Sequence, residues 1–162
     1  MKNLERKKYK RLKINLLILI VFLIQTLMVV GFSNTKSFIE SKYPLSYIMD
    51  TYLFISLLMN PILVSSLVKK VIEIEEKNKM WQMQIMLGGK VNSILINKFK
   101  NLSIKLVFLQ LIEAFVFILA ARKGVNFSLS KEVLIRFLVF NLSVIVINLF
   151  FLAIFMIVEM KV

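Results

Sequence analysis

The sequence predicts an all-α polytopic membrane protein, with about four transmembrane helices and a helical cytoplasmic loop between the second and the third. Apolar residues make up 59% of the 162-residue chain, against roughly 45–50% in soluble domains. They fall in four long blocks instead of short stripes. The net charge of +13 comes largely from Lys and Arg at the borders of these blocks, where basic residues hold loops in the cytoplasm and contact anionic membrane lipid.

The first apolar block, residues 14–32, follows a basic N-terminal segment, residues 1–13, that carries seven of the 22 Lys and Arg. A helix of this length crosses a hydrocarbon core about 30 Å thick. We therefore expect residues 1–13 to be a basic cytoplasmic N-terminus and residues 14–162 to form the transmembrane domain. A cleaved signal peptide is the alternative, although its apolar region is normally only about 7–15 residues long.

The other three blocks predict the remaining transmembrane helices, at residues 52–68, 102–121 and 133–158. We expect the second helix to kink near Asn60 and Pro61, because proline removes one backbone donor. The fourth block is long enough to cross the membrane while tilted.

The distribution of Lys and Arg predicts the orientation of these helices. Seven precede the first block and eight lie between Lys69 and Lys105, against two and three in the other two connections. By the positive-inside rule, both termini and the loop of residues 69–101 lie in the cytoplasm of a multi-pass cell-membrane protein. Five aromatic residues are available as interfacial anchors: Tyr9, Tyr43, Tyr47, Tyr52 and Trp81.

Several kinds of chemistry are excluded by the composition. The chain has neither Cys nor His, which removes thiol nucleophiles, Cys/His zinc sites and His-based acid–base catalysis. It also has no G-x-x-x-x-G-K-[ST] loop with which to bind ATP. Glu75 and Glu76 form an adjacent carboxylate pair of the kind that some membrane proteases use. Those protease sites also need His, which this chain lacks. We expect no catalytic residue, metal or cofactor, and no nucleic-acid partner, since the basic residues border apolar blocks.

The loop of residues 69–101 has two differently patterned halves. In residues 90–101 the apolar residues recur at helical spacing, which predicts an amphipathic helix lying on the membrane or against a partner. Residues 71–87 contain an acidic cluster that repels anionic lipid and so favours contact with a protein. The cluster consists of Glu73, Glu75 and Glu76.

The run from Glu73 to Lys90, with Lys98 beyond it, resembles a loop of the ABC-2-type transporter permeases. In particular, it is similar to the permease subunits of lantibiotic immunity, or self-protection, transporters. In that family the loop between the second and third spans docks on a separate ATPase subunit through an acidic residue, a bulky residue and a basic helix. The resemblance implies an ATPase contact formed by Glu73, Glu75, Glu76, Trp81, Lys90 and Lys98.

Two features differ from the family pattern. Gly88 and Gly89 stand where the family usually has a proline turn, and the chain has four apolar blocks where the family has six spans. We therefore expect a C-terminally truncated or degenerate member. The resemblance implies a permease that exports or expels a hydrophobic or peptide substrate, such as a lantibiotic or another bacteriocin, together with an ATP-binding subunit and a second permease subunit in a homo- or heterodimer. The alternative is a small non-transporting adaptor or regulatory protein.

Polar residues inside the predicted spans form the second candidate site. Glu113 lies in the middle of the third block and Asn141 eight residues into the fourth, so an antiparallel pair of helices brings them to similar depth. A carboxyl at that depth is costly unless it is protonated or paired, and the candidate partners are Asn141, Gln110 and Arg136. These residues either hold the helices together or belong to a substrate path or proton relay.

Overall fold

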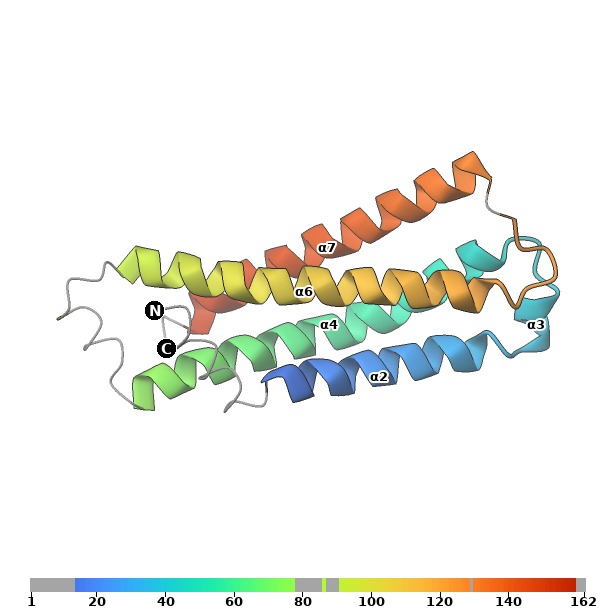
Figure 1. Cartoon of the computed structure of the whole chain (residues 1–162). Coiled ribbons are helices and arrows are strands. Elements are labelled where there is room, and N and C mark those ends of the chain that lie inside the picture. The colour runs from blue at the N-terminus through green and yellow to red at the C-terminus, as the bar shows by residue number, and fades with distance from the viewer. Residues whose placement is uncertain (1–13, 78–85, 87–90, 129, 160–162) are drawn as a thin grey trace.

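The computed structural model describes residues 14–77, 86, 91–128 and 130–159, and no β-strand occurs among them. Its elements are α2 (Ile14–Phe32), the short α3 (Lys36–Ile39), α4 (Pro44–Lys77), α6 (Val91–Ala121) and α7 (Lys131–Glu159) (Figure 1). All four long helices are long and apolar enough to cross a membrane. The predicted all-α polytopic membrane fold is therefore confirmed.

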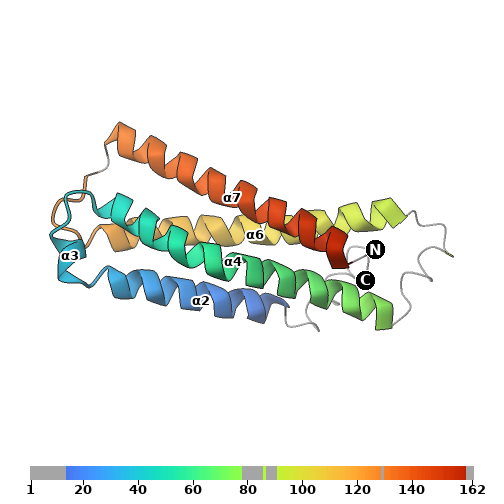
Figure 2. The same ribbon diagram turned by 180° about the vertical axis from the view of Figure 1, so that it is seen from behind.

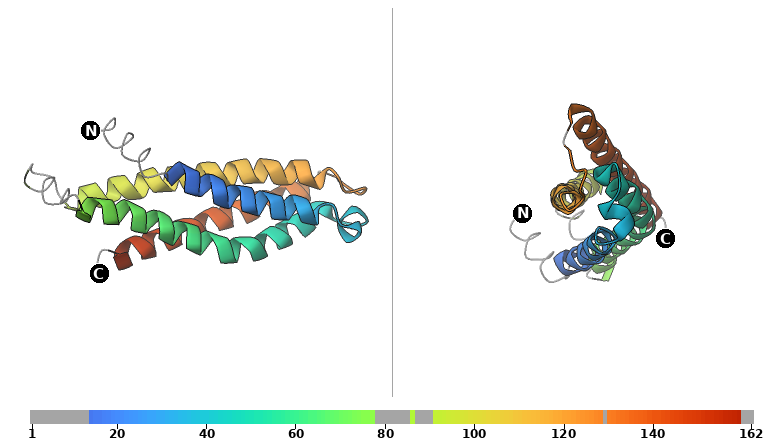
Figure 3. Two further views of the ribbon diagram at one scale, coloured as in Figure 1. Left: turned by 90° about the horizontal axis from the view of Figure 1, so that it is seen from below. Right: turned by 90° about the vertical axis from the view of Figure 1, so that its right-hand side faces the viewer.

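The helices form an elongated bundle in which α6 contacts each of the other three long helices. In the end-on view, α2, α4 and α7 form a curved row and α6 packs across its inner side (Figure 3). The start of α2 and the end of α7 lie at one end of the bundle, called here the Ile14 end, and the opposite end is the α3 end (Figure 1). Helix α7 crosses the others at an angle, and its Lys131 end stands away from α6 (Figure 2).

The outward faces of the long helices are apolar. Helix α7 shows this clearly, because its buried residues form one narrow stripe spaced three or four residues apart, namely Phe137, Asn141, Val144, Asn148, Leu152 and Met156. Between them, Leu142 is 61% exposed. Apolar surface of this extent is unusual on a soluble monomer but natural in lipid, which is as apolar as the side chains themselves.

The bundle interior contains two apolar clusters, separated along the helices by polar residues. The cluster toward the Ile14 end includes Leu67, Leu102 and Leu152, and the cluster toward the α3 end includes Phe38 and Phe117. Because the hydrophobic effect does not drive helices together within lipid, dispersion contacts and interhelical hydrogen bonds must hold them. The polar layer between the clusters is therefore central to the fold.

The observed helix boundaries match the apolar blocks at α2 and nearly at α7, but α4 and α6 are longer than expected. Helix α4 begins at Pro44, where proline suits the first turn, and continues to Lys77. Residues 91–101 are the first turns of α6 instead of a separate surface helix. Residues 69–77 of α4 and residues 91–101 of α6 contain neither proline nor glycine. Nothing therefore ends these two helices where the hydropathy of the sequence falls.

Pro61 lies inside α4 without ending it. Because proline has no backbone N–H, the carbonyl of Leu57, one turn earlier, lacks its usual helical donor. This weak point lies at mid-span, beside Asn60. The kink expected there stays a prediction.

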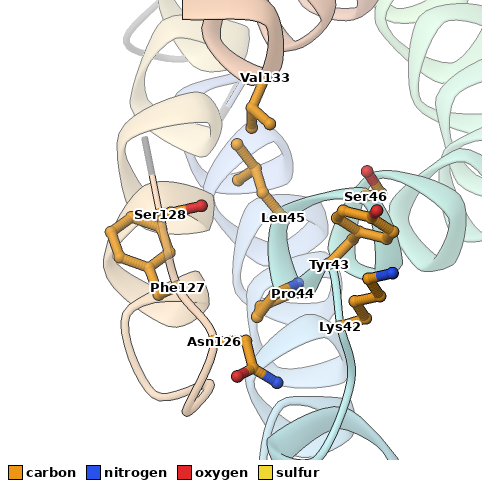
Figure 4. A pocket seen from close by; sticks show the side chains of 9 residues that line it. All are labelled: Lys42, Tyr43, Pro44, Leu45, Ser46, Asn126, Phe127, Ser128 and Val133. Carbon is orange, nitrogen blue, oxygen red and sulfur yellow. The ribbon is translucent and has the colours of Figure 1, made fainter. Parts of the chain in front are cut away.

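Hydrogen bonds join the two connections at the α3 end. The Val125 N–H donates to the Ile39 carbonyl at 3.2 Å, and the Asn126 side-chain amide donates to the Ser41 carbonyl at 3.1 Å. Beside them is a small pocket with about 260 Å³ of empty space, part of it open to solvent, lined by Lys42, Tyr43, Pro44, Leu45, Ser46, Asn126, Phe127, Ser128 and Val133 (Figure 4). These contacts fix the start of α4 against the loop that leads into α7.

Replacing Gly124 by alanine is expected to destabilise this end of the protein. A methyl group at Gly124 would collide with the Pro44 ring, meeting its Cγ and lying 2.7 Å from its Cβ. The ring cannot rotate away as a flexible side chain would, so we expect a loss of about 1–3 kcal/mol in the free energy of unfolding. Denaturant unfolding of the purified protein in detergent measures it, with Gly31→Ala as the control because Gly31 has nothing within 4 Å. Equal stability of the two variants would contradict this packing.

Candidate functional site: a buried polar cluster

Seven polar side chains from all four long helices meet in the interior at mid-depth, and we call them the polar cluster. Each is less than a tenth exposed. The members are Gln25 from α2, Tyr52 and Asn60 from α4, Gln110 and Glu113 from α6, and Asn141 and Asn148 from α7. Polar groups are expensive to bury in a membrane unless they bond to one another.

The strongest contact in the polar cluster joins α4 to α6. The Tyr52 hydroxyl donates to Glu113 Oε2 at 2.6 Å and lies 3.1 Å from Gln110 Oε1. A phenol has one proton to give, so the shorter contact to the carboxyl is the principal bond. The Tyr52 ring is held in place by Phe117, with ring centroids 4.4 Å apart.

Two further hydrogen bonds extend the polar cluster to the remaining helices. The Gln110 amide donates to Asn141 Oδ1 at 3.1 Å, joining α6 to α7. The Gln25 amide donates to Asn60 Oδ1 at 2.8 Å, joining α2 to α4. Separate interhelical bonds therefore join α2 to α4, α4 to α6 and α6 to α7, each worth about 0.6 kcal/mol on average inside a membrane.

Three oxygen atoms of the polar cluster have no hydrogen-bond partner among the described residues: Gln25 Oε1, Glu113 Oε1 and Asn148 Oδ1. Glu113 and Asn148 line one crevice between α4, α6 and α7, together with Asn60, Leu63, Val64, Leu106, Leu109 and Gln110. The crevice has about 220 Å³ of empty space but is nowhere wide enough for a water-sized sphere. Bulk water therefore does not enter this crevice in this conformation.

The structure brings together three of the four intramembrane residues chosen from the sequence. Glu113 and Asn141 lie at similar depth, and Gln110, which bonds to Asn141, lies 3.1 Å from the Tyr52 hydroxyl that bonds to Glu113. Arg136 is exposed near the start of α7 and does not belong to the polar cluster. The bonded partner of Glu113 is Tyr52 instead, which the sequence analysis missed.

The expectation that Tyr52 anchors the protein at the membrane interface is wrong. Tyr52 is fully buried, because α4 begins at Pro44 and so places it more than two turns inside the helix. The polar residues near the midpoints of the second and fourth apolar blocks, Asn60 and Asn148, indicate other members of the polar cluster, but Tyr52 is the first residue of its predicted block and had no such signal.

The residues expected to contact an ATPase do not all lie on the surface. Glu73 is exposed on the last part of α4, whereas Lys98 is only 2% exposed and so does not present its side chain to a partner. Lys98 precedes the fully buried Leu102 by one turn, on the face of α6 that turns toward the bundle. Glu75 and Glu76 belong to the last turns of α4, but their side chains, like Trp81 and Lys90, lie outside the described residues.

Comparison with known proteins adds no further constraint, because no protein-family model, curated protein or solved structure matches the chain. Four apolar helices with lipid-compatible outer faces, joined by a buried polar cluster, make this a multi-pass membrane protein.

Proposed function

We propose that the chain is a permease subunit of an ABC transporter, driven by a separate ATPase that docks on the α4–α6 hairpin. The observation that carries the proposal is the length of these two helices. Helix α4 has 34 residues and α6 has 31, which at about 1.5 Å per residue makes them roughly 51 and 46 Å long. A hydrocarbon core is only about 30 Å thick.

All of the excess length of α6 lies at the Ile14 end, whereas that of α4 is divided almost equally between the two ends. The apolar block of α4 ends at residue 68 and that of α6 begins at residue 102, so each helix projects about 14–17 Å beyond its apolar part. The segments attached to this end carry most of the Lys and Arg in the sequence, which supports a cytoplasmic location for it and for both termini. A projecting cytoplasmic hairpin with the exposed Glu73 offers a soluble motor a contact point.

The same two helices lead from the hairpin to the polar cluster without interruption. Helix α4 carries both Glu73 and Tyr52, and α6 carries Glu113, which bonds to Tyr52 at 2.6 Å. A movement of the hairpin driven by ATP hydrolysis would therefore reach the contact that joins the helices at mid-depth. The substrate we propose is a hydrophobic molecule or peptide, such as a lantibiotic, and a second permease subunit would complete its path.

A non-transporting adaptor is the second candidate, and one observation favours it. The crevice among the described residues does not admit water, so these four helices alone offer no passage for a solute in this conformation. An adaptor would use the same hairpin to recruit a partner without transport.

Affinity purification of the full chain from its native membranes tests the proposal. We expect a protein with a P-loop ATPase motif to co-purify, and Glu73→Lys or Trp81→Ala to reduce its recovery about tenfold or more, as for a contact at the centre of an interface. Glu40→Lys is the matched control, because Glu40 is an exposed carboxylate beside α3, at the opposite end.

All variants must first be shown to insert into the membrane at wild-type levels. If the wild type captures no ATPase even after chemical cross-linking, the permease proposal fails. If an ATPase is captured but candidate lantibiotics never alter its rate of ATP hydrolysis, the adaptor is favoured instead.

A further inference from the structure

Arg136 lies in the apolar part of α7, on a side of the helix that faces lipid. It follows Lys131, the first residue of α7, by five residues, which is about 7.5 Å along the helix axis. Arg136 is exposed, and so are its apolar neighbours Ile135 and Val139. An arginine near the end of a transmembrane helix extends its long side chain to the membrane surface. The guanidinium of Arg136 therefore reaches the depth of the lipid headgroups at the α3 end.

The protein itself supplies no anion for this guanidinium. No described residue forms a hydrogen bond or an ion pair with the Arg136 side chain. Glu132, one turn earlier on α7, is also exposed, but an exposed ion pair on one helix contributes little to stability. Residues 32–50 and 119–140, which form the α3 end, carry six Lys and Arg against three Asp and Glu. The charge of this end therefore favours a negatively charged partner.

The side of α7 below Arg136 suits an acyl chain. Val139, Val146 and Phe150 follow Arg136 at helical spacing on one side of α7, and each is more than half exposed. Ser143 lies on the same side, but its hydroxyl donates to the Val139 carbonyl at 2.9 Å and so needs no partner in the lipid. We call Val139, Val146 and Phe150 the acyl stripe. A cation above an apolar stripe matches a phospholipid, in which the phosphate lies above the acyl chains.

We propose that Arg136 binds the phosphate of one phospholipid with a net negative headgroup, and that an acyl chain of this lipid lies along the acyl stripe. The planar guanidinium donates two parallel hydrogen bonds to phosphate oxygens, a geometry that lysine does not provide. The surplus of basic residues at the α3 end favours an anionic headgroup over a zwitterionic one that contains the same phosphate. A free phosphate ion has the same oxygens but no chain with which to cover the acyl stripe.

The proposed lipid site lies at the end of α7 that stands away from α6 (Figure 2). Val133, one turn before Arg136, lines the pocket at the start of α4 together with Lys42 and Ser46 (Figure 4), so further polar groups lie close to the headgroup. A lipid bound to Arg136 holds this end of α7 at the membrane surface. In the orientation proposed above, it belongs to the outer leaflet. The inference goes beyond the proposed function and does not depend on an ATPase partner.

Fluorescence quenching by brominated lipids tests the site in the full chain. Trp81→Phe removes the single tryptophan, and Val139→Trp places a new one on the acyl stripe, one turn from Arg136. The protein is reconstituted in phosphatidylcholine vesicles that contain a fixed share of brominated phosphatidylglycerol or of brominated phosphatidylcholine. We expect the phosphatidylglycerol to bind beside the new tryptophan about fivefold more tightly, which corresponds to about 1 kcal/mol. Arg136→Gln should reduce this ratio to about one.

Leu138→Trp is the matched control for the position of the reporter. Leu138 is exposed at nearly the same depth but on the opposite side of α7, so a tryptophan there should show a ratio of about one. Because Arg136 is exposed and makes no bond to a described residue, Arg136→Gln should fold as the wild type does, which circular dichroism checks.

Three results would overturn the proposal: no preference for phosphatidylglycerol at the Val139→Trp reporter, a preference that survives Arg136→Gln, or the same preference at the Leu138→Trp reporter. Replacing chloride by inorganic phosphate at constant ionic strength separates the two sources of phosphate. We expect the ratio to stay unchanged. Loss of the preference in inorganic phosphate would show that a soluble phosphate, and not a lipid, occupies the site.

Discussion

Tyr52→Ala is expected to lower the free energy of unfolding by about 3–5 kcal/mol, the range measured for truncation of a large buried aromatic side chain. The ring is fully buried and packs on Phe117 at 4.4 Å between centroids and on Phe140 at 6.2 Å. Dispersion contacts are a principal force between helices in lipid, so a cavity here removes packing that nothing else supplies. The variant also leaves Glu113 Oε2 without its donor.

Tyr52→Phe separates the hydroxyl from the ring. It keeps the contacts with Phe117 and removes only the donor to Glu113 and Gln110, so we expect a loss of about 1–2 kcal/mol. Titration of the protein from mild detergent into sodium dodecyl sulfate, followed by circular dichroism, measures both variants on one scale.

Tyr47→Ala is the matched control for this pair of variants. Tyr47 is only partly buried and meets Phe38 edge-on at 5.6 Å between ring centroids, so its truncation should cost about 1 kcal/mol, near the middle of the distribution for single substitutions. If Tyr52→Ala is no more destabilising than Tyr47→Ala, the polar cluster is not the centre of the bundle.

The sequence was sufficient to predict which segments cross the membrane, because each apolar block is long enough to be recognised on its own. It was insufficient for the ends of α4 and α6, because hydropathy reports where lipid ends and not where a helix ends. Residues 69–77 and 91–101 are polar but contain no helix breaker, so the helices continue past the apolar blocks. The length of the projecting hairpin depends on this continuation.

The candidate site was only partly predictable for a related reason. Depth along a helix follows from residue number, which is why Glu113, Gln110 and Asn141 were correctly grouped. The rotation of a helix about its axis is set by the neighbours it packs against. A helix that is apolar on all sides has no polar face, so its sequence does not show which side turns toward the bundle. Tyr52 and Lys98 were misplaced because both lie on faces of their helices that turn toward the bundle.

Leu142→Arg tests the membrane location of the bundle itself. Leu142 is 61% exposed on the outer face of α7, eleven residues after Lys131, and hence near the middle of the span. Arginine at the centre of a transmembrane helix costs about 3 kcal/mol more than leucine, which corresponds to a loss of more than about a hundredfold in the equilibrium for insertion of α7.

Val125→Arg is the control that makes the result specific, because Val125 is even more exposed, at 78%, but lies in the connection between α6 and α7. On a protein surrounded by water, both substitutions would place a charge in solvent and both would be nearly neutral. Since the chain has no cysteine, single cysteines introduced on either side of α7 report its insertion through labelling by a membrane-impermeant thiol reagent. Leu142→Arg reduces insertion more than Val125→Arg only if residue 142 lies in hydrocarbon. Equal insertion of both variants would therefore contradict the assignment of α7 as a transmembrane helix.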